Sequence, residues 1–202
     1  MPKEFGPWSS VYTRFRRWSH SNRWSQMLDL LTRAACVKVR SIDCTHIKVH
    51  QDASNAEGGA RAQAIGQTKG GSNTKLAAVV DGLGRAVGFN LVAGNRHDLR
   101  AVGPLLEKLA GCWAVADRGF DAKIFRQELL ELAATPCIPP RQSNRIQYYY
   151  SKLLYSHRHV VENFFARIKR YRRVGTRYEK LRETFLGFVM LAAILDWLHF
   201  EV

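Results

Sequence analysis

Three carboxylates stand where they could act together on a phosphodiester bond. Asp43 and Asp117 each end a run that reads as a strand, and Glu162 lies in a segment that reads as a helix. Polar groups at the carboxyl ends of strands point into the ligand crevice of an open α/β sheet. Shared carboxylates can hold two divalent cations for in-line displacement at phosphorus, and hard oxygen ligands suit Mg²⁺ or Mn²⁺. For either aspartate alone, a role in a turn or a helix cap is the more common interpretation.

The segment around Glu162 carries a polar stripe. Successive residues of a helix turn by about 100°, so Tyr155, Arg158, Glu162 and Lys169 fall within one narrow arc. An ordinary solvated face with an Arg158–Glu162 pair is the alternative interpretation. The apolar residues between them fall on the opposite side and are expected to face the core: Val160, Phe164 and Ile168.

The charge of the chain indicates a polyanionic partner. Lysine and arginine number 31 against 17 acidic residues, a net charge of +14, while 46% of residues are hydrophobic. A folded protein this basic most often binds nucleic acid, although a solvated charged surface is the alternative. A basic run after Glu162 predicts a groove that follows the phosphate backbone. The predicted DNA contacts of the polar stripe and of this run are Tyr155, Arg158, Lys169, Arg170, Arg172, Arg173, Arg177 and Lys180.

Cysteine usage and hydropathy suggest a reduced cytoplasmic protein. Cys36, Cys44, Cys112 and Cys137 contain no C-x-x-C pair, so neither a zinc knuckle nor a redox motif is indicated. The start of the chain does not read as a secretory leader. The most apolar stretch, residues 185–195, is too short to cross a bilayer and reads as a buried helix.

The periodicity predicts a mixed α/β sheet with helices packed on it. Alternation predicts strands on both sides of Asp43, and an apolar run followed by glycines predicts a hairpin. A basic and aromatic stretch at residues 1–35 reads as short helices. We expect strands at 37–43, 45–50, 75–81, 85–92, 112–117 and 135–138, and helices at 99–109, 123–132, 151–173 and 180–200.

Other polar residues offer weaker signals. Asp81 precedes a glycine and reads as a hairpin-turn residue, and Asp121 reads as the N-cap of a helix. Asp98 is either a helix cap or a group that supports the site from outside. His46 and His50 share one face of a strand, but no third ligand is placed to complete a zinc site.

The glycine-rich stretch at residues 66–72 superficially resembles a phosphate loop. It lacks the order of glycines, lysine and hydroxyl that such a loop requires, and no helix is predicted after it, so we reject nucleotide binding. Lys69 and Lys75 are predicted to contact DNA phosphates, with simple solvation as the alternative.

The spacing Y-x2-R-x3-E-x6-K that begins at Tyr155 resembles the signature of DDE transposases of bacterial insertion sequences, of the insertion-sequence-five type. Further segments resemble the motifs of that family in the same order along the chain. They are Ser41-Ile-Asp43, Gly70-Gly71 with Thr74-Lys75, Gly94-Asn-Arg-His97-Asp98, Ala116-Asp117-Arg-Gly-Phe120-Asp121, and Thr176-Arg177-Tyr178-Glu179-Lys180.

The resemblance implies an RNase H-like fold, in which a mixed sheet is flanked by helices. It implies that Asp43, Asp117 and Glu162 are catalytic and hold two Mg²⁺ or Mn²⁺ ions. The implied reaction is DNA strand cleavage and strand transfer at insertion-sequence ends. The implied partners are terminal-repeat and target DNA in a bacterial, nucleoid-associated setting without a membrane, and a homo-oligomer is left open.

Such transposases usually begin with a longer helical DNA-binding region. We expect residues 1–35 to be a remnant of that region and residues 36–202 to form the catalytic domain. The alternatives are a truncated, non-catalytic DNA-binding remnant of a transposase and a nuclease of the same fold.

Overall fold

The computed structural model describes residues 2–33 and 37–199, and its central element is the long strand β1 (Val39–Val49). On one side β1 pairs antiparallel with β3 (Gly71–Asp81), from Arg40 opposite Asp81 to Lys48 opposite Asn73. On the other side it pairs in parallel with β5 (Trp113–Val115).

The sheet extends outward from this centre. β4 (Ala86–Ala93) continues the antiparallel side by pairing with β3, and β6 (Thr135–Cys137) continues the parallel side by pairing with β5. Two short strands, β2 (Gly66–Thr68) and β7 (Thr176–Arg177), pair with β3 and β1. Three antiparallel strands followed by two parallel ones form the mixed RNase H-like sheet that we expected.

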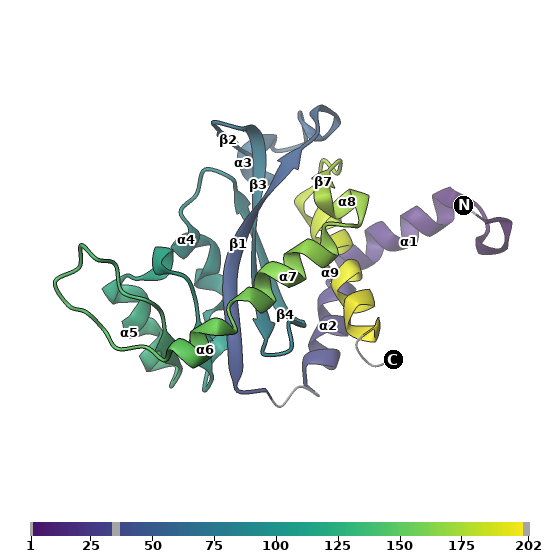
Figure 1. Ribbon diagram of the computed structural model, residues 1–202. Coiled ribbons are helices and arrows are strands. Elements are labelled where there is room, and N and C mark those ends of the chain that lie inside the picture. Colours follow the sequence, from purple (N-terminus) through teal and green to yellow (C-terminus); the bar gives the residue numbers. More distant parts are fainter. Residues whose placement is uncertain (1, 34–36, 200–202) are drawn as a thin grey trace.

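Helices cover both faces of the sheet (Figure 1). One hydrophobic core joins a sheet face to helices that include Leu28, Phe164 and Trp197, and a second core joins the other face to helices that include Leu105 and Leu129. Because both faces are covered, the middle of β3 is a continuous buried run and does not alternate. The helices of the first layer are α1 (Trp8–His20), α2 (Arg23–Arg33), α7 (His159–Ile168) and α9 (Arg182–His199), and those of the second are α4 (Asp98–Val102), η3 (Gly103–Leu109) and α5 (Lys123–Glu131).

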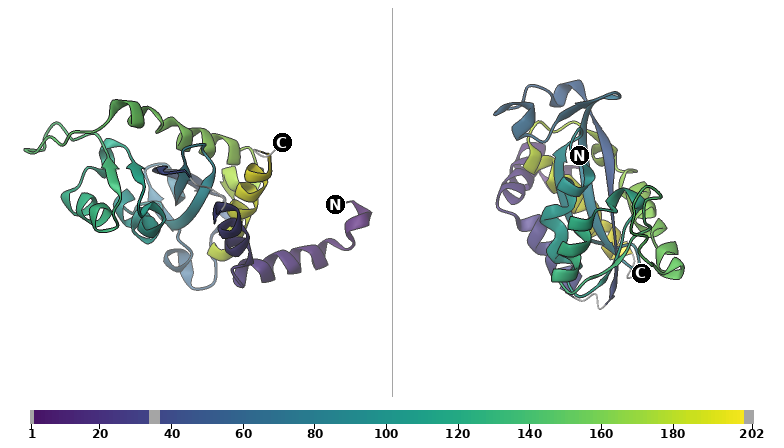
Figure 2. Two further views of the ribbon diagram at one scale, coloured as in Figure 1. Left: turned by 90° about the horizontal axis from the view of Figure 1, so that it is seen from below. Right: turned by 90° about the vertical axis from the view of Figure 1, so that its left-hand side faces the viewer.

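Two segments project from this body. In Figure 2 the N-terminal end of α1 and the loop before α6 (Lys152–Ser156) extend at opposite ends of the molecule. The start of α1 leaves Trp8 exposed, whereas Phe15 in its middle packs against Phe188 of α9 with ring centroids 4.2 Å apart. No helix in the described part of the chain is long and apolar enough to span a membrane.

Two predicted elements were wrong in detail. The predicted strands at 37–43 and 45–50 are one strand, so Asp43 lies in the middle of β1 and does not end it. The predicted helix at 151–173 is divided into α6, α7 and α8 (Arg172–Gly175). Between α6 and α7 the backbone tightens to i→i−3 hydrogen bonds, from Arg158 to Tyr155 and from Val161 to Arg158, which interrupts the α-helical ladder.

The end positions of other elements differ less. The predicted helix at 99–109 is α4 followed by the 3-10 helix η3, and the last predicted helix is α9. Cys36, the residues at 34–35 and Phe200 lie outside the described residues.

Arg177 was predicted to contact DNA, but its side chain is wholly buried. Its Nη1 donates to the Gln63 carbonyl and to Thr74 Oγ1, each at 2.7 Å, and its Nε donates to the Glu179 carbonyl at 2.9 Å. Burial lowers the pKa of Arg177 to about 10, so the group still carries its charge at neutral pH. Because the guanidinium is buried and donates hydrogen bonds to other groups of the protein, we remove Arg177 from the predicted DNA contacts.

We predict that Arg177→Met destabilises the protein by about 3–5 kcal/mol, because it leaves buried oxygen acceptors without donors. Urea unfolding measures this change. Arg170→Met removes an exposed arginine and should change the free energy of unfolding by no more than about 0.5 kcal/mol. Equal stability of the two variants would contradict the structural role of Arg177.

Candidate active site

The register of the sheet places two of the three predicted carboxylates side by side. Ser41 of β1 pairs with Val115 of β5 in parallel. Asp43 and Asp117 each lie two residues further along their own segments, and residues two apart in an extended chain share one face. The two aspartates therefore occupy the same edge of neighbouring segments, although Asp43 is inside its strand and Asp117 follows the end of its own.

Asp117 is held by the turn that follows β5. Its Oδ1 accepts a hydrogen bond from the backbone N–H of Gly119 at 2.8 Å, which caps the 3-10 turn η4 (Arg118–Phe120). A Cβ atom at Gly119 would lie only 2.9 Å from the same Oδ1. The glycine is thus required for the carboxylate to sit this close to the backbone.

Asp43 is an acid that resists ionisation. Its side chain is 21% exposed, and burial is the largest cause that raises its pKa from 3.8 to about 6. A hydrogen bond from the backbone N–H of Cys44, at 2.7 Å, acts in the opposite direction. The charges of Asp117 and Glu162 raise the pKa further, and Arg158 lowers it. These influences place all three carboxylates and one arginine in the same electrostatic neighbourhood.

Arg158 lies between two of the carboxylates. Its Nη2 donates to Glu162 Oε1 at 2.7 Å, and its Nη1 is 3.8 Å from Asp43 Oδ2. The Glu162 side chain is 52% exposed, so its carboxylate can turn toward solvent. Tyr155 flanks this group: its ring is 6.0 Å from the Arg158 guanidinium carbon and packs edge-on against Tyr150.

Among residues 2–33 and 37–199, no group of three or more His, Cys, Asp or Glu side chains lies close enough to hold a metal ion. The guanidinium of Arg158 stands where positive charge is needed between Asp43 and Glu162. Convergence of the three carboxylates on cations therefore stays a prediction. His50 pairs with Asp52 at 3.2 Å.

Lys169 lies close to the first aspartate. Its Nζ donates to Thr45 Oγ1 at 2.5 Å and to the His46 carbonyl at 3.3 Å. Thr45 follows Asp43 by two residues in β1 and so shares its face. Our reading of the sequence missed Thr45, although the alternation of β1 through Asp43 would have identified it.

Most of the exposed basic residues that were predicted to contact DNA follow α7 in the sequence. Arg172 stacks over the ring of Tyr178 at 5.2 Å, which holds one guanidinium against an aromatic face. Arg173 instead pairs with Glu179, so its charge is partly neutralised. The predicted contacts that remain exposed are Lys69, Arg170, Arg172, Arg173 and Lys180.

Lys75 cannot serve as the predicted DNA contact in this conformation. Its side chain is buried, and its Nζ donates to Asp98 Oδ1 at 2.6 Å and to the Arg96 carbonyl at 2.5 Å. The same contact decides the role of Asp98, which pairs with Lys75, while His97 caps the helix by accepting from the Leu99 N–H. We therefore remove Lys75 from the DNA contacts.

The rival aspartates have structural roles. Asp81 closes the β3–β4 turn by accepting from the N–H groups of Leu83 and Arg85, as predicted. Asp121 is not the helix cap that we predicted, because α5 begins after Ala122 and has no side-chain cap. Asp121 is instead buried and pairs with Arg126.

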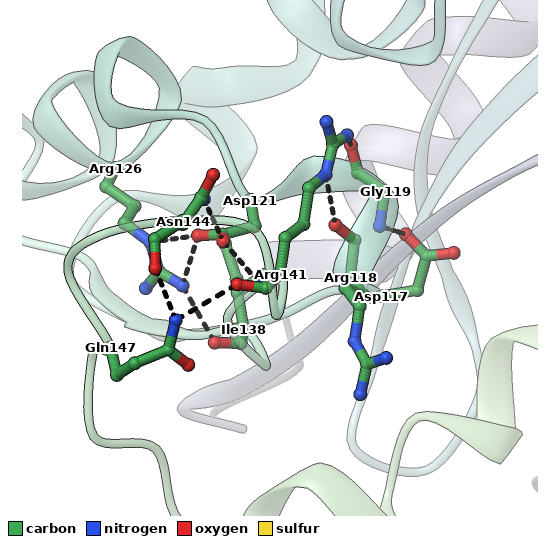
Figure 3. Close-up of polar contacts among 9 residues, drawn as sticks. All are labelled: Asp117, Arg118, Gly119, Asp121, Arg126, Ile138, Arg141, Asn144 and Gln147. Carbon is green, nitrogen blue, oxygen red and sulfur yellow. Dashed lines mark hydrogen bonds and ion pairs between the residues drawn. The ribbon is translucent and has the colours of Figure 1, made fainter.

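The buried Asp121 holds the loop before α6 against the Asp117 segment (Figure 3). Its Oδ2 accepts from the Arg141 backbone N–H at 2.7 Å and from Asn144 Nδ2 at 2.6 Å. Arg141 in turn donates to the carbonyls of Arg118 and Gly119. Hydrogen bonds to Arg126, Arg141 and Asn144 hold the pKa of Asp121 below its usual value despite burial, so it is ionised at neutral pH.

The chain is similar to proteins described as transposases. A protein of Brucella ovis described as a transposase for insertion sequence element IS6501 is 36% identical over 128 residues, which cover 62% of this chain and 98% of that protein. Two solved structures are distantly similar: a pre-cleavage Mos1 transpososome (TM-score 0.33, 14% identity) and a Mos1 transposase paired-end complex with the left transposon end (TM-score 0.31, 13% identity).

The similarity to the solved structures covers 91% and 89% of this chain, which spans 61% of each Mos1 chain. At these TM-scores the likeness adds nothing to the argument about the site. Residues 34–197 match the family described as Transposase DDE domain, a match that includes Asp43, Asp117 and Glu162. This chain therefore belongs to the family of transposase DDE domains.

Proposed function

We propose that this chain is a transposase of the insertion-sequence-five type that cleaves DNA strands and transfers them at the ends of an insertion sequence. Asp43, Asp117 and Glu162 would hold two Mg²⁺ or Mn²⁺ ions. The observation that carries the proposal is the sheet register that brings Asp43 and Asp117 together, with Asp43 buried at the cost of a raised pKa. Carboxylates whose pKa is raised by burial and by neighbouring charges cluster at functional sites.

The proposed donor set fits hard divalent cations, because Asp43, Asp117 and Glu162 offer only carboxylate oxygens. When bound, such ions activate the attacking oxygen and stabilise the leaving oxygen of a phosphodiester. The residues themselves provide the negative charge, and Asp117 is already oriented by its bond to Gly119.

Arg158 has a separate role in this proposal. In the described conformation it neutralises Glu162 and partly neutralises Asp43. A DNA phosphate is a bidentate partner for a guanidinium. Competition by that phosphate would free Glu162, whose exposed carboxylate can then turn toward Asp43 and Asp117. Tyr155 would keep the Arg158 side chain in place through its ring.

The DNA partner would follow the exposed basic side chains beyond Lys169. Lysine and arginine contacts to phosphates supply affinity without reading bases. Most of the proposed contacts follow α7, the helix that carries Glu162, directly in the sequence. The contacts that we propose are Lys69, Lys169, Arg170, Arg172, Arg173 and Lys180.

We also propose that residues 36–202 form the catalytic unit and that residues 1–35 belong to a helical DNA-binding region. α1 and α2 pack on α9 through Phe15 and Leu28, so the two parts share one hydrophobic core. The helices would thereby be held at a fixed position relative to the carboxylates.

The test of the function is strand cleavage with Mg²⁺ on duplex DNA that carries the ends of the element encoding the chain. We expect Glu162→Gln to lower the cleavage rate on the order of 100-fold or more while DNA binding persists, because it removes a charged ligand with little change of volume. The matched control is Glu131→Gln, an exposed glutamate of α5.

Each of the other outcomes contradicts one part of the proposal. Cleavage by Glu162→Gln at the wild-type rate contradicts the ligand assignment. Cut strands that are never joined to target DNA indicate a nuclease. Binding by the wild-type chain without any cleavage indicates a non-catalytic remnant.

Asp43→Asn should stabilise the metal-free protein at pH 8. The folded-state pKa of Asp43, about 6, exceeds its ordinary value of 3.8. Folded protein therefore binds more protons between about pH 4 and pH 6, and the free energy of unfolding falls as pH rises through that window. At pH 8 the variant should be more stable by about 1–3 kcal/mol, and near pH 3 the difference should vanish.

Urea unfolding in EDTA measures this difference, with Glu131→Gln as the control. Added Mg²⁺ should then stabilise the wild-type chain and leave Asp43→Asn unchanged, since binding to the folded state alone raises stability. Equal stability of Asp43→Asn and wild type at pH 8 would show that Asp43 ionises as readily in the folded protein as in the unfolded chain.

Lys169→Ala should weaken DNA binding and reduce the slope of log affinity against log salt by about 0.9, the value for one phosphate contact. Fluorescence anisotropy at several salt concentrations measures the slope. Lys123→Ala, an exposed lysine of α5, is the matched control and should leave the slope unchanged. A wild-type slope for Lys169→Ala would limit Lys169 to its contact with Thr45.

A further inference from the structure

A cavity of about 420 Å³ lies beside β4, which is separated from the carboxylate-bearing β1 by β3. Four arginines from four different segments line it, and no acidic residue does. Residues of β4 also line it and include Asn90 and Leu91. The arginines are Arg61 of α3 (Gly59–Ala62), Arg96 of the turn after β4, Arg100 of α4 and Arg182 at the start of α9.

The positive charge of this cavity is not neutralised within the described part of the chain. None of the four guanidiniums forms an ion pair there. Arg182 Nη2 donates only to Asn90 Oδ1, at 3.3 Å, and the Arg182 Nε is buried without a hydrogen-bond partner. Like charges around one cavity repel, and a buried donor without an acceptor costs free energy, so an anion in the cavity would relieve both.

The backbone that carries two of these arginines is anchored. A Cβ atom at Gly94 would meet Asn73 Cβ at 2.6 Å and the Asn73 carbonyl at 2.8 Å, so the turn after β4 lies directly on β3. Lys75 then fixes the same segment through the Arg96 carbonyl and Asp98. The segment from Gly94 to Arg100 is thus set by its own contacts, and its guanidiniums are free to bind a ligand.

The geometry of the cavity favours phosphates of a polymer. Guanidiniums bind phosphate oxygens in pairs, which makes arginine the usual residue for phosphate recognition. Arg61, Arg96 and Arg100 are exposed at the rim, whereas small-molecule sites enclose most of the ligand surface. A backbone that crosses the cavity fits this rim better than a compound enclosed in it.

We propose that this arginine cavity binds the phosphate backbone of a second DNA segment, so that one chain holds one duplex at the carboxylates and another beside β4. The inference rests on the proposed function, because it assumes that the first segment is the one that is cut. Within that function, the cavity gives the chain a place for flanking or target DNA.

A bridging assay tests the second site. The wild-type chain is bound to an immobilised duplex, and capture of a second, labelled duplex is measured. Arg96→Gln/Arg100→Gln should reduce capture about tenfold or more and lower its salt slope by about 1.8, the value for two phosphate contacts. Lys38→Gln/Lys123→Gln removes two exposed charges that are not among the proposed DNA contacts and is the matched control. Should the first variant not fold, Arg61→Gln/Arg100→Gln replaces it.

The outcomes separate this inference from the proposed function. Capture by Arg96→Gln/Arg100→Gln at the control level, or a wild-type chain that binds a single duplex only, overturns the second site. Inorganic pyrophosphate that binds the wild type but not this variant, with capture unchanged, assigns the cavity to a small phosphate compound and also overturns it. Cleavage of a single end is measured in parallel: absence of wild-type cleavage with arginine-dependent capture contradicts the proposed function and supports the second site.

Discussion

The parallel pairing of β1 with β5 is the constraint on which the site depends. The pairing of Ser41 with Val115 fixes the positions of the residues that follow them in the two segments. Asp43 and Asp117 are each two residues further on, so the same pairing sets their positions. β1 is itself held by nine paired positions with β3, from Arg40 to Lys48. A slip of one residue would turn Asp43 to the other face of the sheet, among the apolar side chains that include Val79 and Val102. The hydrophobic pattern of β1 thus protects the position of the carboxylate.

This position carries an electrostatic cost that the surrounding residues reduce and do not remove. Asp43 is partly buried beside two further acids, which is why its pKa is raised. Arg158 reaches Glu162 and approaches Asp43, so the site contains a counter-charge when no cation is present. Ionised Asp43 is unfavourable beside two other acids when no cation is bound, and a ligand that brings positive charge would reduce this cost. Stability and the proposed function therefore make opposite demands on Asp43.

Much of the fold followed from periodicity, because buried strands and amphipathic helices have distinct patterns. The mixed sheet, the turn at Asp81 and the apolar face of α7 were predicted correctly. The break at Arg158 was not, because both sides of it keep helical spacing and only the backbone hydrogen bonds differ. Lys75 and Arg177 were misjudged for one reason: a basic residue in a strand shows no local sign that its partner, such as Asp98 or Thr74, lies far away in sequence.

The loop before α6 is held mainly through backbone groups. Arg141 binds the carbonyls of Arg118 and Gly119, and Gln147 binds carbonyls of the loop itself, at residues 141 and 144. Every residue type has a backbone carbonyl, so these bonds survive substitution of the residues that accept them. The exposed side chains at positions 142, 143, 145 and 146 form none of these bonds. Natural variation at these four positions can therefore alter what the loop touches while the Asp117 turn is inherited unchanged.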